Sequence, residues 1–296
     1  MSISSVRGAT VCGLLALLVW SCAPGLMRSI SQEFGPIGGA ALMYSFGAAL
    51  LFMIFGRPKL RNTSRLYLLC GSVLFVTYEV CLALALGYAN NSEQSIQVGV
   101  VNSLWPCLTV LLAMLINGQK ARWLIVPGTA LALVGMVTVV SLNGMSMASF
   151  VSNVQSNPLS YGMAALCSVT FALYCNVTRR YANGENHVAL FFLLTAVALW
   201  VKYAFSNEQL PGFDLNNSFE MIAVVLSLAG GYALWNIGVL RGNLTLLATL
   251  SYFSPVMTSA FAAVWLGASL TLQFWQGVLL VTLGSLLCWY ATRDKA

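Results

Sequence analysis

Most side chains able to do chemistry in this chain lie inside long apolar runs. Glu79 is the only acidic residue deep within such a run, and it directly follows Tyr78. A carboxylate in apolar surroundings is costly and usually marks a functional site. Desolvation would keep Glu79 protonated, or polar groups such as Asn102 would pair with it. Three roles stay open: binding a substrate ammonium group, carrying a coupling proton, or holding adjacent helices together while neutral.

Aromatic and polar side chains recur at helical spacing in several of these runs. Asn102 and Trp105 share one helix face, as do Tyr232, Trp235 and Asn236. A deep tryptophan needs an acceptor for its indole N–H, which favours a protein interior or a cavity. One such stripe is also typical of packing, but several together predict one polar cavity lined by aromatic rings. We expect its lining to include Trp20, Tyr78, Glu79, Asn102, Trp105, Tyr174, Tyr232, Trp235, Asn236 and Tyr252.

The same residues argue against catalysis. His187 is the only histidine, and the eight cysteines lie in apolar runs without a CxxC pair, so a metal site is not expected. A hydrolase within the membrane would need a nucleophile with a base or paired acids. No GxxxxGK[ST] loop is present to bind a nucleotide. We therefore expect neither an enzyme nor a cofactor.

The composition identifies an integral membrane protein. Of the 296 residues, 59% are hydrophobic and 7% are charged, and the mean hydropathy is +0.82. Soluble domains carry roughly 25% charged residues, so a soluble enzyme, a nucleic-acid-binding domain and a disordered chain are all excluded. A membrane helix needs about 20 apolar residues. The sequence contains ten such runs, at 8–29, 37–56, 66–88, 95–117, 123–141, 159–180, 188–205, 219–240, 243–267 and 272–292.

The basic residues predict the orientation of these spans. With the N-terminus in the cytoplasm, twelve of the 14 Lys and Arg residues fall on the cytoplasmic side, and only Arg28 and Lys202 fall outside. This asymmetry follows the positive-inside rule. It also accounts for the basic isoelectric point without a nucleic-acid partner. Both termini are therefore expected in the cytoplasm.

An internal repeat predicts the architecture. A shift of 149 residues places Pro106, Gly128 and Gly135 on Pro255, Gly277 and Gly284, and a two-residue slip also matches Arg28 with Arg179. The chain then divides into residues 1–141 and 159–296, joined by a loop at 142–158. Each unit has five spans, an odd number, so the second unit enters the membrane from the opposite side. Inverted repeats of this kind are typical of secondary transporters with a site near the membrane midplane.

The two repeat prolines fall in the middle of their spans. Pro106 lies about ten residues into the fourth span, and Pro255 about twelve residues into the ninth. Proline removes a backbone hydrogen bond and kinks a helix, which lipid tolerates only where other groups satisfy the freed carbonyl. We expect two bent helices that line the cavity and take part in gating.

These features resemble the drug/metabolite transporter superfamily and its EamA-type repeats. The segments at 75–88 (FVTYEVCLALALGY), 98–135, which contains NSLWP, 252–255 (YFSP) and 284–293 are similar to bacterial inner-membrane exporters of aromatic amino acids. The resemblance implies an all-α transporter that exports Phe, Tyr and Trp by alternating access. It implies individual cavity residues only within the TYE and NSLWP segments.

Two matters stay open at this stage. A transporter of the same fold for other amino acids, metabolites or amphipathic toxic compounds is the alternative. The expected partners are the small-molecule substrate and the lipid bilayer, with a monomer as the simplest assembly.

Overall fold

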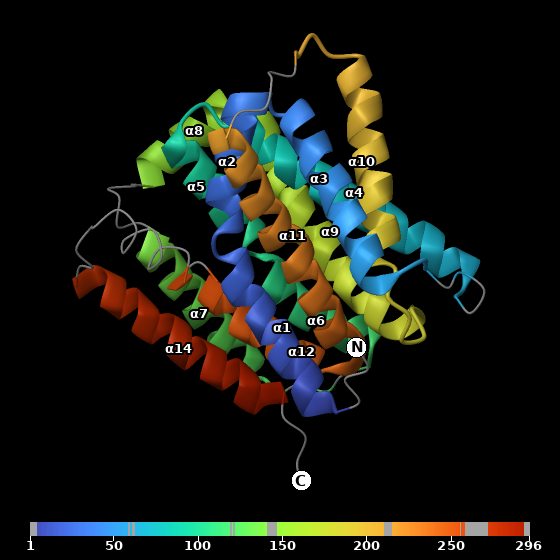
Figure 1. The fold of residues 1–296 in the computed structure, drawn as a ribbon. Helices are drawn as coiled ribbons and strands as arrows, with labels where there is room; N and C mark the ends of the chain where they lie inside the picture. Colours follow the sequence, from blue (N-terminus) through green and yellow to red (C-terminus); the bar gives the residue numbers. More distant parts are fainter. Residues whose placement is uncertain are drawn as a thin grey trace.

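The computed structural model describes residues 5–58, 60, 63–118, 120, 122–140, 147–209, 215–254, 256–257 and 272–292. Throughout these ranges the regular elements are helices, as Figure 1 shows. The first part of the chain forms α1 (Val6–Trp20), α2 (Ala23–Phe34), α3 (Gly38–Phe55), α4 (Arg65–Gly87), α5 (Ser92–Asn102), α6 (Trp105–Ile116) and α7 (Ile125–Val140). The second part forms α8 (Met147–Ser156), α9 (Pro158–Tyr181), α10 (Val188–Ala204), α11 (Leu215–Arg241), α12 (Leu244–Leu250), the 3₁₀ turn η3 (Ser251–Phe253) and α14 (Leu272–Thr292).

Several of the helices have the length and composition of membrane spans. Among the described residues, α3, α4, α9 and α11 are each long and apolar enough to cross a bilayer. The pair α1 and α2 passes the same test together, with a bend of 43° between them, and five shorter helices are also apolar. Helices satisfy their own backbone hydrogen bonds, which lipid cannot do. The expectation of an all-helical, polytopic membrane protein is thus confirmed.

Two predicted spans are broken instead of continuous. The first span, expected at 8–29, consists of α1 and α2 with the break at Ser21 and Cys22. The fourth span, expected at 95–117, is divided into α5 and α6 at Ser103 and Leu104. In both cases a proline occupies the first turn of the second helix, where its missing N–H costs nothing. Pro106 therefore begins a helix and does not kink the middle of one, which corrects our expectation.

The segment 142–158 and the repeat proline Pro255 are only partly covered by the described residues or lie outside them. The segment 142–158, expected to be a connecting loop, contains the helix α8 and the first residue of α9. Pro255 lies outside the described residues, but the three residues of η3 that precede Ser254 leave the α-helical geometry of α12. The ninth span is therefore interrupted just before its repeat proline, at the place that matches the break in the fourth.

Helices from the first part of the chain pack mainly on helices from the second part. The most extensive pairs are α7 with α14, α1 with α11, α4 with α9, and α3 with α10. The helices α7 and α14 lie side by side along one edge of the bundle (Figure 1). They run antiparallel, since Gly128 lies against Cys288 whereas Gly135 lies against Val281.

Glycines allow α7 and α14 to approach closely. A Cβ atom at Gly135 would lie 2.6 Å from the Val281 amide nitrogen and 2.8 Å from the Gly277 carbonyl oxygen. A Cβ atom at Gly284 would meet the Gly128 carbonyl oxygen at 2.6 Å. Real Cβ contacts are never this short, so the helix separation depends on the absence of these side chains. Small residues are the usual means of helix association in membranes.

The substitution Gly135→Ala should destabilise the protein, because its methyl group meets backbone atoms that cannot rotate away. Overpacking of this kind costs about 1–3 kcal/mol. The control is Gly162→Ala on α9, where a Cβ meets nothing within 4 Å and helix propensity favours alanine by about 1 kcal/mol. Thermal unfolding in detergent measures both. Equal effects of the two variants would contradict the close contact.

Candidate functional site

A cluster of aromatic rings fills the centre of the bundle between α1, α4, α6, α9 and α11. The ring of Trp235 lies 5.4 Å from Trp20 and 5.4 Å from Trp105, measured between ring centroids. Phe171 stacks on Tyr78 at 4.5 Å and meets Trp105 edge-on at 4.9 Å. Of the residues we expected around the site, Trp20, Tyr78, Trp105, Tyr174, Tyr232 and Trp235 all belong to this cluster or pack against it.

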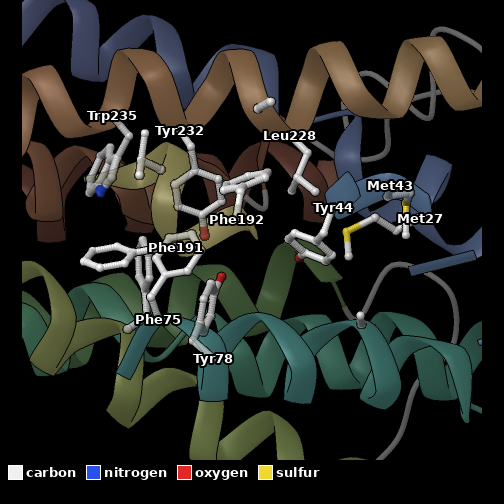
Figure 2. Packing of buried hydrophobic residues seen from close by; sticks show 14 of the residues in the cluster. Met27, Met43, Tyr44, Phe75, Tyr78, Phe191, Phe192, Leu228, Tyr232 and Trp235 are labelled. Carbon is white, nitrogen blue, oxygen red and sulfur yellow. The ribbon is translucent and has the colours of Figure 1, made fainter. Parts of the chain in front are cut away.

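Several phenylalanines complete the cluster. Phe75 touches Tyr174, Phe192 and Tyr232 with centroid distances of 5.1, 5.7 and 5.1 Å, as part of the packing that Figure 2 shows. Phe191 packs on the same ring. These residues were not predicted, because a phenylalanine in an apolar run has no polar atom to indicate whether it faces protein or lipid.

Glu79 is fully buried beside this cluster. It accepts a hydrogen bond from the hydroxyl group of Tyr44, which lies on α3. The hydroxyl group of Tyr232 lies next to the same carboxylate, and Tyr78 and Tyr232 point toward each other in Figure 2. Asn102 was our example of a polar group able to pair with Glu79, and in the structure Tyr44 makes such a contact. The available signal was a lone tyrosine in the apolar run at 37–56.

Several buried polar atoms near the cluster have no hydrogen-bond partner among the described residues. Two of them are acceptors, Oε1 of Glu79 and Oδ1 of Asn102, and two are donors, Nε1 of Trp235 and Nδ2 of Asn236. The other amide atom of Asn236, Oδ1, accepts a bond from the Tyr174 hydroxyl at 3.0 Å, and the Cys175 thiol lies beside Trp235. An unsatisfied buried polar group costs about 1–3 kcal/mol. Their concentration at one place points to a polar ligand or water that satisfies them.

The position of Trp20 depends on the break between α1 and α2 and on a glycine of α11. Trp20 is the last residue of α1, and its indole N–H points to the Leu228 carbonyl oxygen at 3.5 Å. One turn further along α11, a Cβ atom at Gly231 would collide with the indole ring. Ser227 also donates a hydrogen bond of 2.7 Å to the Val19 carbonyl oxygen. The pair Gly230–Gly231 was the signal for this contact in the sequence.

Tyr252 lies elsewhere. Its side chain is fully buried, but in a separate small cluster with Met136 and Val281, which belong to α7 and α14. The 3₁₀ turn η3 places Tyr252 there, because three residues per turn change the face on which it emerges. The structure thus brings together nine of the ten expected lining residues and places the tenth apart. Groups of three side chains able to hold a metal ion are absent from the part of the chain described.

Comparison with known proteins identifies the class of protein. The EamA-like transporter family matches this chain twice, at residues 8–141 and 159–290, so the chain belongs to that family. Our expectation of an EamA-type transporter is confirmed.

Two curated relatives share the name of an aromatic amino acid exporter. The chain is 49% identical over 288 residues to the aromatic amino acid exporter YddG of Salmonella typhimurium, covering 97% of this chain and 98% of the relative. It is 48% identical over 286 residues to the Escherichia coli protein of that name, covering 96% and 98%. A solved crystal structure with 25% identity superposes with a TM-score of 0.80 over 98% of this chain and 99% of the other.

Removing the Tyr44 hydroxyl should destabilise the protein. In Tyr44→Phe the buried carboxyl group of Glu79 loses one of its hydrogen-bond donors, which costs about 1–3 kcal/mol. The matched control is Tyr181→Phe, whose ring is 47% exposed. Thermal unfolding should show a lower midpoint for Tyr44→Phe alone. Equal midpoints would mean that the Tyr44–Glu79 hydrogen bond contributes nothing.

The packing of Trp20 can be tested with two adjacent glycines. Gly231→Ala should displace the indole ring, whereas Gly230→Ala meets nothing within 4 Å. Near-ultraviolet circular dichroism reports the packing of aromatic rings. We expect a changed spectrum for Gly231→Ala and the original spectrum for Gly230→Ala, and the reverse order would show that Trp20 lies elsewhere.

Proposed function

We propose that this protein exports Phe, Tyr and Trp from the bacterial cytoplasm across the inner membrane by alternating access. The observation that carries the proposal is identity of 48–49% over nearly the whole chain to two proteins named aromatic amino acid exporters. The central cluster supports it, since a flat aromatic side chain can replace ring–ring contacts that the cluster already makes.

The polar atoms around the cluster suit the other end of an amino acid. An α-ammonium group needs acceptors, and Glu79 and Asn102 each offer an unpartnered one. An α-carboxylate needs donors, which the N–H groups of Asn236 and Trp235 supply, that of Trp235 lying beside the Cys175 thiol. Apart from Trp20, which is half-buried, the aromatic side chains of the cluster are at most 7% exposed. They touch one another in this structure. A substrate must therefore separate them when it enters, and Tyr252 then contributes only at the edge of the site.

We further propose that ten spans form two five-span repeats of opposite orientation. We count α1 with α2 as the first span and α5 with α6 as the fourth. The contact between α1 and α11 then joins the first and eighth spans, and the contact between α4 and α9 joins the third and sixth. Moving each span by five places therefore converts one contact into the other. The same exchange leaves the pairs α7–α14 and α3–α10 unchanged.

Individual residues follow this exchange. Gly135 faces Gly277 and Val281, while Gly284 faces Gly128 and Ala132, and each residue of the second set lies 149 positions from its counterpart in the first. The antiparallel course of α7 and α14 supports inversion, because equivalent helices of inverted repeats run in opposite directions.

The orientation of the chain and the role of the breaks belong to the same proposal. The N-terminal end of α1 and the C-terminal end of α14 lie at one end of the bundle (Figure 1), and the distribution of Lys and Arg favours the cytoplasm for that end. The interruptions before Pro106 and Pro255 would serve as hinges, because a broken span can bend without losing further backbone hydrogen bonds.

Transport by the purified protein tests the proposal. Liposomes containing the protein and loaded with labelled Phe, Tyr or Trp should release each of them faster than empty liposomes, with and without a pH gradient. Glu79→Gln should reduce release if the carboxylate binds the substrate, and the exposed acid Glu33, changed to Gln, is the control. If none of the three amino acids is released, the proposed substrates are wrong. Release of other metabolites instead would favour the alternative transporter.

A further inference from the structure

The two helices that flank the central site are joined at both of their ends by other helices. The helix α4 carries Tyr78 and Glu79, and α11 carries Tyr232, Trp235 and Asn236. They run antiparallel, so the C-terminal end of each lies beside the N-terminal end of the other. One joining element is α2, and the other is the last turn of α9.

At one end, two consecutive residues of α2 reach the two helices. Nη1 of Arg28 donates hydrogen bonds to the carbonyl oxygens of Leu86 and Gly87, at 3.0 and 3.1 Å, at the C-terminus of α4. Oγ of Ser29 donates a hydrogen bond of 2.5 Å to Oε2 of Glu220, near the N-terminus of α11. Residues 28 and 29 therefore bridge α4 and α11; we refer to them as the first latch.

At the opposite end, two consecutive residues of α9 contact the same two helices, with the roles of α4 and α11 exchanged. Nη1 of Arg179 donates to the carbonyl oxygens of Val239 and Leu240, at 3.3 and 2.8 Å, at the C-terminus of α11. Oγ1 of Thr178 accepts a hydrogen bond of 3.1 Å from the Tyr67 hydroxyl, near the N-terminus of α4. Residues 178 and 179 are the second latch.

The arginine contacts of the two latches share one chemistry, whereas Ser29 donates to a carboxylate and Thr178 accepts from a hydroxyl group. The last carbonyl groups of a helix have no amide partners within it, and the negative end of the helix dipole favours a cation there. A guanidinium group satisfies two such carbonyls at once. These bonds form and break without exposing apolar surface, unlike the close glycine contacts between α7 and α14.

We propose that the two latches are the positioning residues that hold the opposite ends of the site closed, and that each must release for the site to open on its own side. The inference rests on the proposed alternating access. Both latches are formed in this structure, and the rings between them are packed together, so the site is closed at both ends. Release of the first latch opens the end at Arg28, and release of the second opens the end at Arg179.

Two buried thiols report which end is open. Cys167 and Cys175 on α9 are 0% exposed. Sγ of Cys167 contacts the Tyr78 carbonyl oxygen at 3.3 Å, and Cys175 lies beside Trp235. A membrane-impermeant maleimide can be added to right-side-out or inverted membrane vesicles that contain the full chain. Peptide mass spectrometry then gives the labelling rate of each thiol separately from the other cysteines.

The variants are Arg28→Gln and Arg179→Gln, with Arg180→Gln as the matched control. Arg180 is adjacent and exposed, as Arg179 is, but its guanidinium group lies over the ring of Tyr181. We expect Arg28→Gln to increase the labelling rate on the order of tenfold from the Arg28 face only, because charge-assisted hydrogen bonds are lost at that end. Arg179→Gln should give a similar increase from the opposite face only, and Arg180→Gln should give none.

The result that overturns the proposal is labelling that rises from the same face in both variants, from both faces in either variant, or not at all. Where a Gln variant fails to fold, Arg28→Lys or Arg179→Lys retains a cation at the helix end and should give a smaller increase on the same single face. Labelling needs no substrate, so one-sided labelling without Phe release would refute the substrates and keep the latches. Phe release with two-sided labelling would refute the latches alone.

Discussion

The hydrocarbon core of a membrane offers no hydrogen bonds to a protein, and this constraint governs every level of the structure. It requires helices, because each must satisfy its own backbone groups. It also gathers polar side chains inside the bundle, where Glu79 has a tyrosine hydroxyl as its partner. At the helix ends, Arg28 and Arg179 donate hydrogen bonds to the open carbonyl groups. Where partners are missing, as at Asn102 and Asn236, the same constraint marks the place that a polar ligand or water would satisfy.

The two kinds of helix contact in this bundle serve different purposes. The glycine contacts between α7 and α14 bring backbone atoms together and leave no room for adjustment. The latch residues of α2 and α9 reach the ends of α4 and α11 through hydrogen bonds to carbonyl, carboxylate or hydroxyl groups. Packing of the first kind resists rearrangement, whereas hydrogen bonds of the second kind can be exchanged for bonds to water near a membrane surface. A bundle with a rigid edge and latched ends is suited to motion around a central site.

Sequence reasoning predicted which deep residues gather in the central cluster better than it predicted their contacts. Depth in a span and a shared helix face were enough to find Trp105, Tyr174 and Trp235, because a polar atom on a deep aromatic ring needs a protein interior. Neither signal could assign Tyr44 to Glu79, since the two residues are 35 positions apart on different helices. Tyr252 was misplaced because a 3₁₀ turn changes the face of the helix, and no pattern of residue types shows that turn.

The sequence by itself determined the class of structure: apolar runs of span length, few charges and a repeat of prolines and glycines predict an all-helical membrane protein of the EamA type. Such patterns are local or periodic, so they can be read along the chain. Only the tertiary structure decided that Pro106 lies in the first turn of a helix after a break, that Gly231 makes room for Trp20, and that Arg28 and Arg179 bind opposite ends of the same two helices. These features depend on which helices become neighbours, and that choice results from the packing of all of them together.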